Sequence, residues 1–165
     1  MIRKILAPTD LSELSRAGVR YALNKAKDHG TEVIIYHVVT TDEMLKLGER
    51  LRGDGLRTSE SPNLLKSYLE TYRGRLARFV RENFSDLLPL ARVYKKLELG
   101  SPDKNIVALA ESEGVDLIVM STHGRTGLSR VLLGSVTERV IRNAPCPVLA
   151  IPPHSAEVGA EFYVA

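Results

Sequence analysis

The chain has 165 residues, of which 44% are apolar and 26% charged, a composition typical of one globular domain with a sizeable core. Its net charge of +3 comes from lysines and arginines mixed among acids, and its few aromatic residues form no stacking series, so a nucleic-acid partner is excluded. No apolar run approaches the roughly 20 residues of a membrane span, and Met1–Pro8 is too short for a signal peptide, so a cytoplasmic location is expected.

The first part of the chain predicts two strands separated by a helix. Residues 2–8 are expected to form a strand that ends at Pro8, because proline cannot donate to a strand ladder. The helix follows, with Ser12 as its N-cap and Gly30 just past its end. Residues 32–39 are a β-branched apolar run, which is typical of a central strand buried on both faces.

A long connection separates this central strand from the next one. Residues 42–52 have helical periodicity, and residues 53–62 are rich in glycine and serine and are predicted to be mobile. Residues 63–84 then form a long amphipathic helix. Residues 91–99 alternate apolar and polar side chains, as a half-exposed edge strand does.

The last third of the chain predicts two more helix–strand units. One helix has Ser101 at its N-cap and stops at Gly114, and the apolar run 117–120 after it is a buried strand. A helix over 135–143 and a fifth strand over 145–151 follow. The regular alternation of strands and helices predicts an α/β fold, a three-layer open sandwich with a five-stranded parallel sheet covered by helices on both faces.

The cysteine and histidine residues give little indication of a disulfide, a metal site or a catalytic group. A single cysteine, Cys146, excludes an internal disulfide and a cysteine-cluster metal site, and it is expected to be a small buried residue. His29, His37 and His154 have no metal-ligand spacing with one another or with acids, so no metal site is predicted. His123 has no carboxylate near it in the sequence, and a catalytic role is not supported.

The segment from the fourth strand to the helix at residue 135 has the features of an anion site. Gly124, Gly127 and Gly134 permit positive φ and leave no Cβ between backbone and ligand. Ser135, with Glu138 three residues later, is predicted to form a capping box at a helix N-terminus, where backbone N–H groups and the helix dipole favour negative charge. A phosphate cradle is one interpretation, and a loop whose glycines only make turns is the other.

The same segment resembles the nucleotide loop of the universal stress protein family, Gly-x2-Gly-x9-Gly-[Ser/Thr]. Gly124, Gly134 and Ser135 keep this spacing, and Ser121 stands in place of the first glycine. The resemblance covers residues 1–151 and leaves 152–165 as a C-terminal tail. It implies strand order 3-2-1-4-5 in an adenine nucleotide alpha hydrolase-like fold, a ligand that is ATP, ADP or AMP with or without Mg²⁺, and a homodimer through strand five.

With that strand order, a ligand crevice is expected where strands one and four diverge. Asp10 should face the sugar or base, because a carboxylate accepts hydrogen bonds from hydroxyl and amino groups and repels phosphate. By resemblance, Pro8 and Thr9 contact adenosine, and the backbone of Val38 and Val39 lies beside adenine. The complete predicted set is Pro8, Thr9, Asp10, Val38, Val39, Met120, Ser121, Gly124, Arg125, Gly127, Gly134, Ser135, Val136 and Thr137.

Other nucleotide folds do not match. The dinucleotide fingerprint Gly-x-Gly-x-x-Gly is missing after the first strand, and Leu133-Gly134-Ser135 lacks the lysine of a P-loop. Two hypotheses remain open: an ATP-binding regulatory protein of the stress response that switches an unknown protein partner through nucleotide occupancy and dimerisation, or a nucleotide-free dimeric interaction protein. At most slow ATP hydrolysis is expected, and the tail is predicted to pack across the dimer interface.

Overall fold

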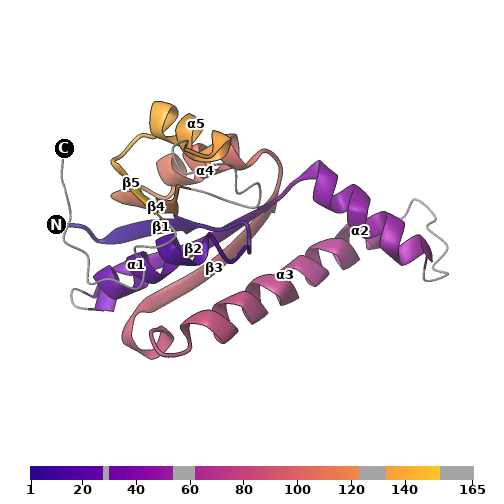
Figure 1. Cartoon of the computed structure of the whole chain (residues 1–165), viewed down its shortest axis with the longest axis horizontal. Coiled ribbons are helices and arrows are strands. Elements are labelled where there is room, and N and C mark those ends of the chain that lie inside the picture. Colours follow the sequence, from indigo (N-terminus) through magenta and orange to yellow (C-terminus); the bar gives the residue numbers. More distant parts are fainter. Residues whose placement is uncertain (28–29, 54–61, 123–132, 153–165) are drawn as a thin grey trace.

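The computed structural model of the chain describes residues 1–27, 30–53, 62–122 and 133–152 (Figure 1). Three predicted features therefore lie outside the described residues. They are most of the connection expected to be mobile, the C-terminal tail beyond residue 152, and the part of the nucleotide loop that holds His123, Gly124, Arg125 and Gly127.

Five parallel strands form one sheet in the order β3-β2-β1-β4-β5, as predicted. The strands are β1 (Lys4–Pro8), β2 (Glu32–Val39), β3 (Arg92–Leu99), β4 (Leu117–Ser121) and β5 (Val148–Ile151). β1 pairs with β2 on one side and with β4 on the other, with Ile5 opposite Leu117 and Leu6 opposite Ile118. The direction of winding therefore reverses between β1 and β4, and a crevice is expected at their carboxyl ends.

Most helices have the predicted bounds to within a few residues. They are α1 (Arg16–Lys27), α2 (Thr41–Gly53), α3 (Pro62–Phe84), the short 3₁₀ helix η1 (Leu88–Leu90), α4 (Pro102–Ser112) and α5 (Ser135–Asn143). There are two exceptions: η1 was not predicted, and α1 begins at Arg16 and not beside Ser12, so the prediction of Ser12 as N-cap is wrong. The glycines predicted to follow α1 and α4 adopt the left-handed conformation of helix ends, with φ of 62° at Gly30 and 59° at Gly114.

Helices cover both faces of the sheet and give three layers (Figure 1). α1 and α3 pack on the face formed by alternate residues such as Ile5 and Ile35, and α4 and α5 pack on the face formed by Leu6 and Ile34. Every residue of β2 after Glu32 is buried, as expected for the central strand. β3 is a partly exposed edge, also as predicted.

Cys146 packs against the cluster beneath α4 and α5 and is partly buried. Burial raises the pKa of its thiol, which disfavours the reactive thiolate. The residue therefore behaves as a small apolar side chain, as the sequence predicts.

α2 and the start of α3 extend past the carboxyl edge of the sheet (Figure 1). Leu47 of α2 packs on Tyr68 and Tyr72 of α3, and the side chain of Val39 at the end of β2 completes this small core. The helix pair thereby forms a wall beside the ends of β1 and β2. Among the described residues, no helix has the length and apolar character needed to cross a membrane.

Candidate functional site

A cavity of about 350 Å³ opens at the carboxyl ends of the central strands, where the winding reverses. Ten of the predicted site residues line it: Pro8, Thr9, Asp10, Val38, Met120, Ser121, Gly134, Ser135, Val136 and Thr137. Eight further residues complete the described lining: Ser15, Tyr36, His37, Thr40, Asp42, Glu43, Pro102 and Ile106. Segments more than 100 residues apart in the sequence therefore meet at one cavity of a size usual for small-molecule sites.

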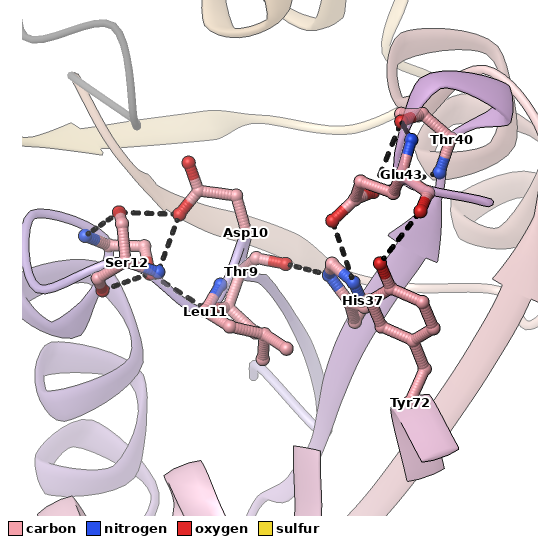
Figure 2. Close-up of polar contacts among 9 residues, drawn as sticks. Thr9, Asp10, Leu11, Ser12, His37, Thr40, Glu43 and Tyr72 are labelled. Atoms are coloured by element: carbon pink, nitrogen blue, oxygen red, sulfur yellow. Dashed lines mark hydrogen bonds and ion pairs between the residues drawn. The ribbon is translucent and has the colours of Figure 1, made fainter. Parts of the chain in front are cut away.

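One wall is a tight turn that follows β1 (Figure 2). Thr9 Oγ1 accepts a hydrogen bond from the N–H of Leu11 (3.0 Å), and Asp10 Oδ1 accepts bonds from the N–H (3.0 Å) and hydroxyl (2.5 Å) of Ser12. Leu11 has φ of 63°, a left-handed conformation that costs roughly 1–2 kcal/mol for a residue with a Cβ. The side-chain hydrogen bonds of Thr9 and Asp10 hold the turn in this strained form and fix the position of the Asp10 carboxylate.

The same turn explains why α1 begins late. The Ser12 hydroxyl bonds to Asp10, and it accepts the N–H of Ser15 at the longer distance of 3.3 Å. Ser15 donates its own hydroxyl to the Ser12 carbonyl (2.8 Å) and shares a hydrogen bond of 2.7 Å with Thr9 Oγ1. The serine-rich segment is thus part of the cavity wall, and regular helix starts only at Arg16.

The opposite wall is the end of β4, which α1 approaches very closely. An added Cβ at Gly18 would lie 2.8 Å from both the Met120 carbonyl carbon and the Ser121 nitrogen. The Gly18 N–H donates to Ser121 Oγ (3.0 Å), and Thr137 Oγ1 donates to the Ser121 carbonyl (3.0 Å). Ser121, which stands where the resemblance expects glycine, therefore joins α1 to the first turn of α5.

The N-terminus of α5 faces the cavity. Gly134 is its N-cap with φ of −59°, no side chain caps the helix, and Ser135 is the first helical residue. The predicted capping box is therefore wrong, and the Glu138 carboxylate instead pairs with Arg142 (2.9 Å). The first intrahelical bond runs from Glu138 N–H to the Gly134 carbonyl (3.0 Å), so the N–H groups at 135–137 precede the helical ladder and are oriented for an anion.

A buried polar cluster lies on the α2 side of the cavity (Figure 2). His37 Nδ1 is 2.8 Å from the Thr9 carbonyl oxygen, and its Nε2 is 3.8 Å from Glu43 Oε1. Glu43 Oε2 accepts the N–H of Thr40 (2.9 Å), while Thr40 Oγ1 accepts the N–H of Glu43 (3.2 Å). Thr40 and Glu43 thus form a reciprocal capping box at the start of α2.

Apolar side chains line the side of the cavity toward α4 and α5, where Val38, Ile106 and Met120 belong to one core cluster. Tyr36 donates its hydroxyl to Glu98 Oε2 (2.7 Å), and burial, followed by this carboxylate, raises the pKa of Tyr36, so the phenol stays neutral. Val39 is not brought to the cavity. Its side chain points to the opposite face of the sheet and packs with Leu47.

The charges around the cavity are unevenly distributed. Three carboxylates, those of Asp10, Asp42 and Glu43, lie in its described lining, and no lysine or arginine does. The N-terminus of α5 is the positive end of the helix dipole. Within the part of the chain that the structure describes, no three His, Cys, Asp or Glu side chains gather to hold a metal ion.

Sequence reasoning missed several lining residues for an identifiable reason. Thr40 and Glu43 have the Thr-x-x-Glu spacing of a capping box, which the sequence alone offers as a signal. His37 lies inside an apolar run and shows no local signal of its contact with Thr9. Pro102 and Ile106 have the pattern of ordinary helix residues, and only the packing of α4 beside β2 brings them to the cavity.

Comparison with known proteins gives consistent matches. The model of the universal stress protein family matches residues 1–152. Two proteins of Methanocaldococcus jannaschii are similar along most of their length: universal stress protein MJ0531 is 35% identical, covering 92% of this chain and 82% of its own, and universal stress protein MJ0577 is 36% identical, covering 92% and 95%. The solved structure of MJ0577 superposes with a TM-score of 0.65 at 33% identity, over 92% of this chain and 96% of that one.

A more distant structure shares the fold. A universal stress protein family protein from Arabidopsis thaliana, solved with AMP bound, superposes with a TM-score of 0.58 at 16% identity. The match covers 96% of this chain and 97% of that one. At this identity the likeness establishes the common architecture and does not establish a common ligand.

Proposed function

The chain belongs to the universal stress protein family, and we propose on this ground that it is a nucleotide-binding stress protein whose cavity holds an adenine nucleotide. The observation that carries the proposal is the meeting of two remote segments at the β1–β4 switch point. The Thr9–Asp10 turn supplies hydrogen-bond acceptors, and the start of α5 supplies backbone donors. A ligand that fits both carries donors at one end and negative charge at the other.

The ligand's orientation follows from this chemistry. Phosphate accepts from the N–H groups at 135–137, where the dipole of α5 favours an anion. Ribose hydroxyls donate to the carboxylate of Asp10, which its bonds to Ser12 hold in place. The base lies among Val38, Ile106 and Met120, where an aromatic ring buries apolar surface.

The number of phosphates determines what else must bind. The described lining carries three acids and no lysine or arginine, so a triphosphate would leave much of its charge uncompensated by these residues. Mg²⁺ would therefore enter on the phosphate oxygens of ATP, and AMP would need no cation. The Arabidopsis protein of the same fold holds AMP, which agrees with this view for that protein.

The edge of the sheet at β5 is a candidate dimer interface. β5 is an edge of the sheet and is only partly buried, and the apolar side chains of Leu133 and Ile141 lie exposed near it in the chain. An apolar edge of this kind favours pairing with a second copy. We therefore propose a homodimer through β5, with nucleotide occupancy altering its interaction with a protein partner.

Thermal unfolding of the full chain tests the nucleotide proposal. AMP, ADP and ATP, each with and without Mg²⁺, should stabilise the protein by about 2.7 kcal/mol at 100 times the Kd. For a chain of this length that corresponds to a rise in Tm of roughly 5–10 °C. Asp10→Ala should reduce the rise, and Asp86→Ala, which removes a surface acid outside the cavity lining, serves as control.

The outcome separates the two hypotheses. A rise in Tm with any adenine nucleotide supports the nucleotide-binding role. If none of them raises Tm at millimolar concentration, the nucleotide proposal is refuted and the nucleotide-free interaction protein takes its place. Mass spectrometry of small molecules that co-purify with the chain gives an independent identification of the ligand.

A further inference from the structure

His37 links the predicted nucleotide-binding turn to the N-terminus of α2. We propose that it is a positioning residue, which orients the Thr9–Asp10 turn through a hydrogen bond to the Thr9 carbonyl and which lies beside Glu43 and stacks on Tyr72 (Figure 2). The inference rests on the proposed function, because it assigns His37 a part in binding the nucleotide that acts through the Thr9–Asp10 turn.

The first step is the proton on the ring. A carbonyl oxygen only accepts hydrogen bonds, so the contact of 2.8 Å between His37 Nδ1 and the Thr9 carbonyl requires Nδ1 to carry the hydrogen. The His37 side chain is 2% exposed, so water does not compete for this bond. His37 is therefore in the Nδ1–H form in the neutral state, and this form is fixed by the fold.

The second step is the effect on Asp10. The Thr9 carbonyl belongs to the planar peptide unit whose nitrogen is that of Asp10. A bond that fixes this carbonyl therefore fixes the plane from which Asp10 extends. The turn just beyond has the strained φ of 63° at Leu11, and such a conformation persists only where its surroundings hold it.

The third step is what holds the ring. The Tyr72 ring stacks on His37 with centroids 5.8 Å apart, and Tyr72 donates its hydroxyl to the Glu43 carbonyl (3.3 Å). Glu43 places Oε1 3.8 Å from Nε2 while its Oε2 caps α2 through Thr40. Side chains from β2, α2 and α3 thus set the direction of the Nδ1–H bond, and the start of α2 is tied to the ligand turn.

Two substitutions at one position separate positioning from simple core packing. His37→Asn retains an amide N–H at about the place of Nδ1 and so keeps a donor for the Thr9 carbonyl. His37→Leu has a similar apolar bulk and removes the donor. A purely packing role predicts that leucine is the better replacement, whereas the proposed role predicts that asparagine is.

Isothermal titration of the full chain with AMP and with Mg-ATP measures the effect. We expect His37→Asn to bind within about threefold of the wild type and His37→Leu to bind at least tenfold more weakly. ¹⁵N spectra of the histidine rings give a second readout, in which His37 of the wild type shows the Nδ1–H form. These spectra are recorded on the wild type and so cover the case in which His37→Leu does not fold.

Each result either supports or overturns the assignment of His37 as a positioning residue. Equal binding by wild type and His37→Leu, equally weak binding by both His37 variants, or a neutral ring protonated at Nε2 in the spectra overturns the assignment of His37. These results leave the proposed function intact, because the wild type still binds. If the wild type binds neither nucleotide, the proposed function fails and the positioning role falls with it.

Discussion

Gly18→Ala tests the contact on which both walls of the cavity depend. Gly18 lies in the first turn of α1, and its N–H donates to Ser121 Oγ at the end of β4. A methyl group at this position would lie 2.8 Å from two backbone atoms, those of Met120 and Ser121, which belong to a buried strand and have little freedom to move. The substitution should therefore push α1 away from β4.

Two opposing effects set the size of the change. Alanine is favoured over glycine in a helix by up to about 1 kcal/mol. Forcing a methyl group into a packed contact costs about 1–3 kcal/mol, and weakening the hydrogen bond to Ser121 costs about 1 kcal/mol more. The cost of the steric clash and of the weakened hydrogen bond therefore exceeds the gain in helix propensity, and the free energy of unfolding should fall by about 1–3 kcal/mol.

Gly74→Ala is the matched control. Gly74 lies inside α3, and a Cβ there would meet nothing within 4 Å, so only the helix preference acts. Urea unfolding should show that Gly74→Ala is more stable than the wild type by about 0.5–1 kcal/mol, while Gly18→Ala is less stable. The reasoning is refuted if Gly18→Ala is as stable as the control, and AMP affinity in the destabilised variant should fall as well.

Two further predictions concern the assembly and the response to acid. Ile141→Glu, at an exposed apolar position on α5, should convert the proposed dimer to a monomer in analytical ultracentrifugation. Leu90→Glu on η1 is the control and should leave the dimer unchanged. A monomeric wild type would contradict the proposed dimer. Hydrogen bonds from the N–H groups of Arg3 and Lys4 lower the pKa of the Asp116 carboxyl. The ionised carboxylate therefore stabilises the fold above about pH 4, and this stabilisation is lost as the pH falls through the folded-state pKa. Asp116→Asn should therefore flatten the dependence of urea stability on pH below about 4, and an unchanged slope would show that the carboxylate does not contribute.

The fold was largely predictable because buried parallel strands leave a strong signal. Residues 32–39 form a continuous β-branched run and are the strand β2 with the same bounds. Alternation with amphipathic helices then requires parallel strands and crossovers on both faces. The strand order itself does not follow from that alternation, and it came from the resemblance to the family.

Helix caps were less predictable, because tertiary contacts decide which local pattern is used. Ser135-x-x-Glu138 and Thr40-x-x-Glu43 have the same spacing, yet only the second forms a capping box. Glu43 is buried, its carbonyl accepts a hydrogen bond from the Tyr72 hydroxyl, and its carboxylate lies beside His37. Glu138, in contrast, is at the surface and pairs with Arg142. The spacing alone contains no information on these neighbours.

The dependence on tertiary contacts also limits how many residues of the cavity can be predicted from the sequence. Thr9, Asp10 and Ser135, which line the cavity, could be predicted from the sequence because they adjoin strand ends or a helix start, where ligands of α/β folds bind. His37 was not found, since its partners Thr9 and Glu43 lie 28 positions before it and six after it and only the folded chain brings them together. The resemblance places the backbone of Val39 at the site, and alternation along β2 turns its side chain to the other face.

The arrangement of charge gives the strongest argument for one orientation of the ligand. A nucleotide bound the other way round would place phosphate beside Asp10 and Glu43. Two unit negative charges about 4 Å apart repel by about 4 kcal/mol at the effective dielectric of a site near the surface, which corresponds to roughly a thousandfold in Kd. The N-terminus of α5 favours phosphate at the opposite end of the cavity, so attraction at one wall and repulsion at the other select the same orientation. Because Asp10 would supply much of that repulsion, the proposed orientation predicts that the bonds fixing its turn, including the bond from His37 to Thr9, affect ligand selection as well as affinity.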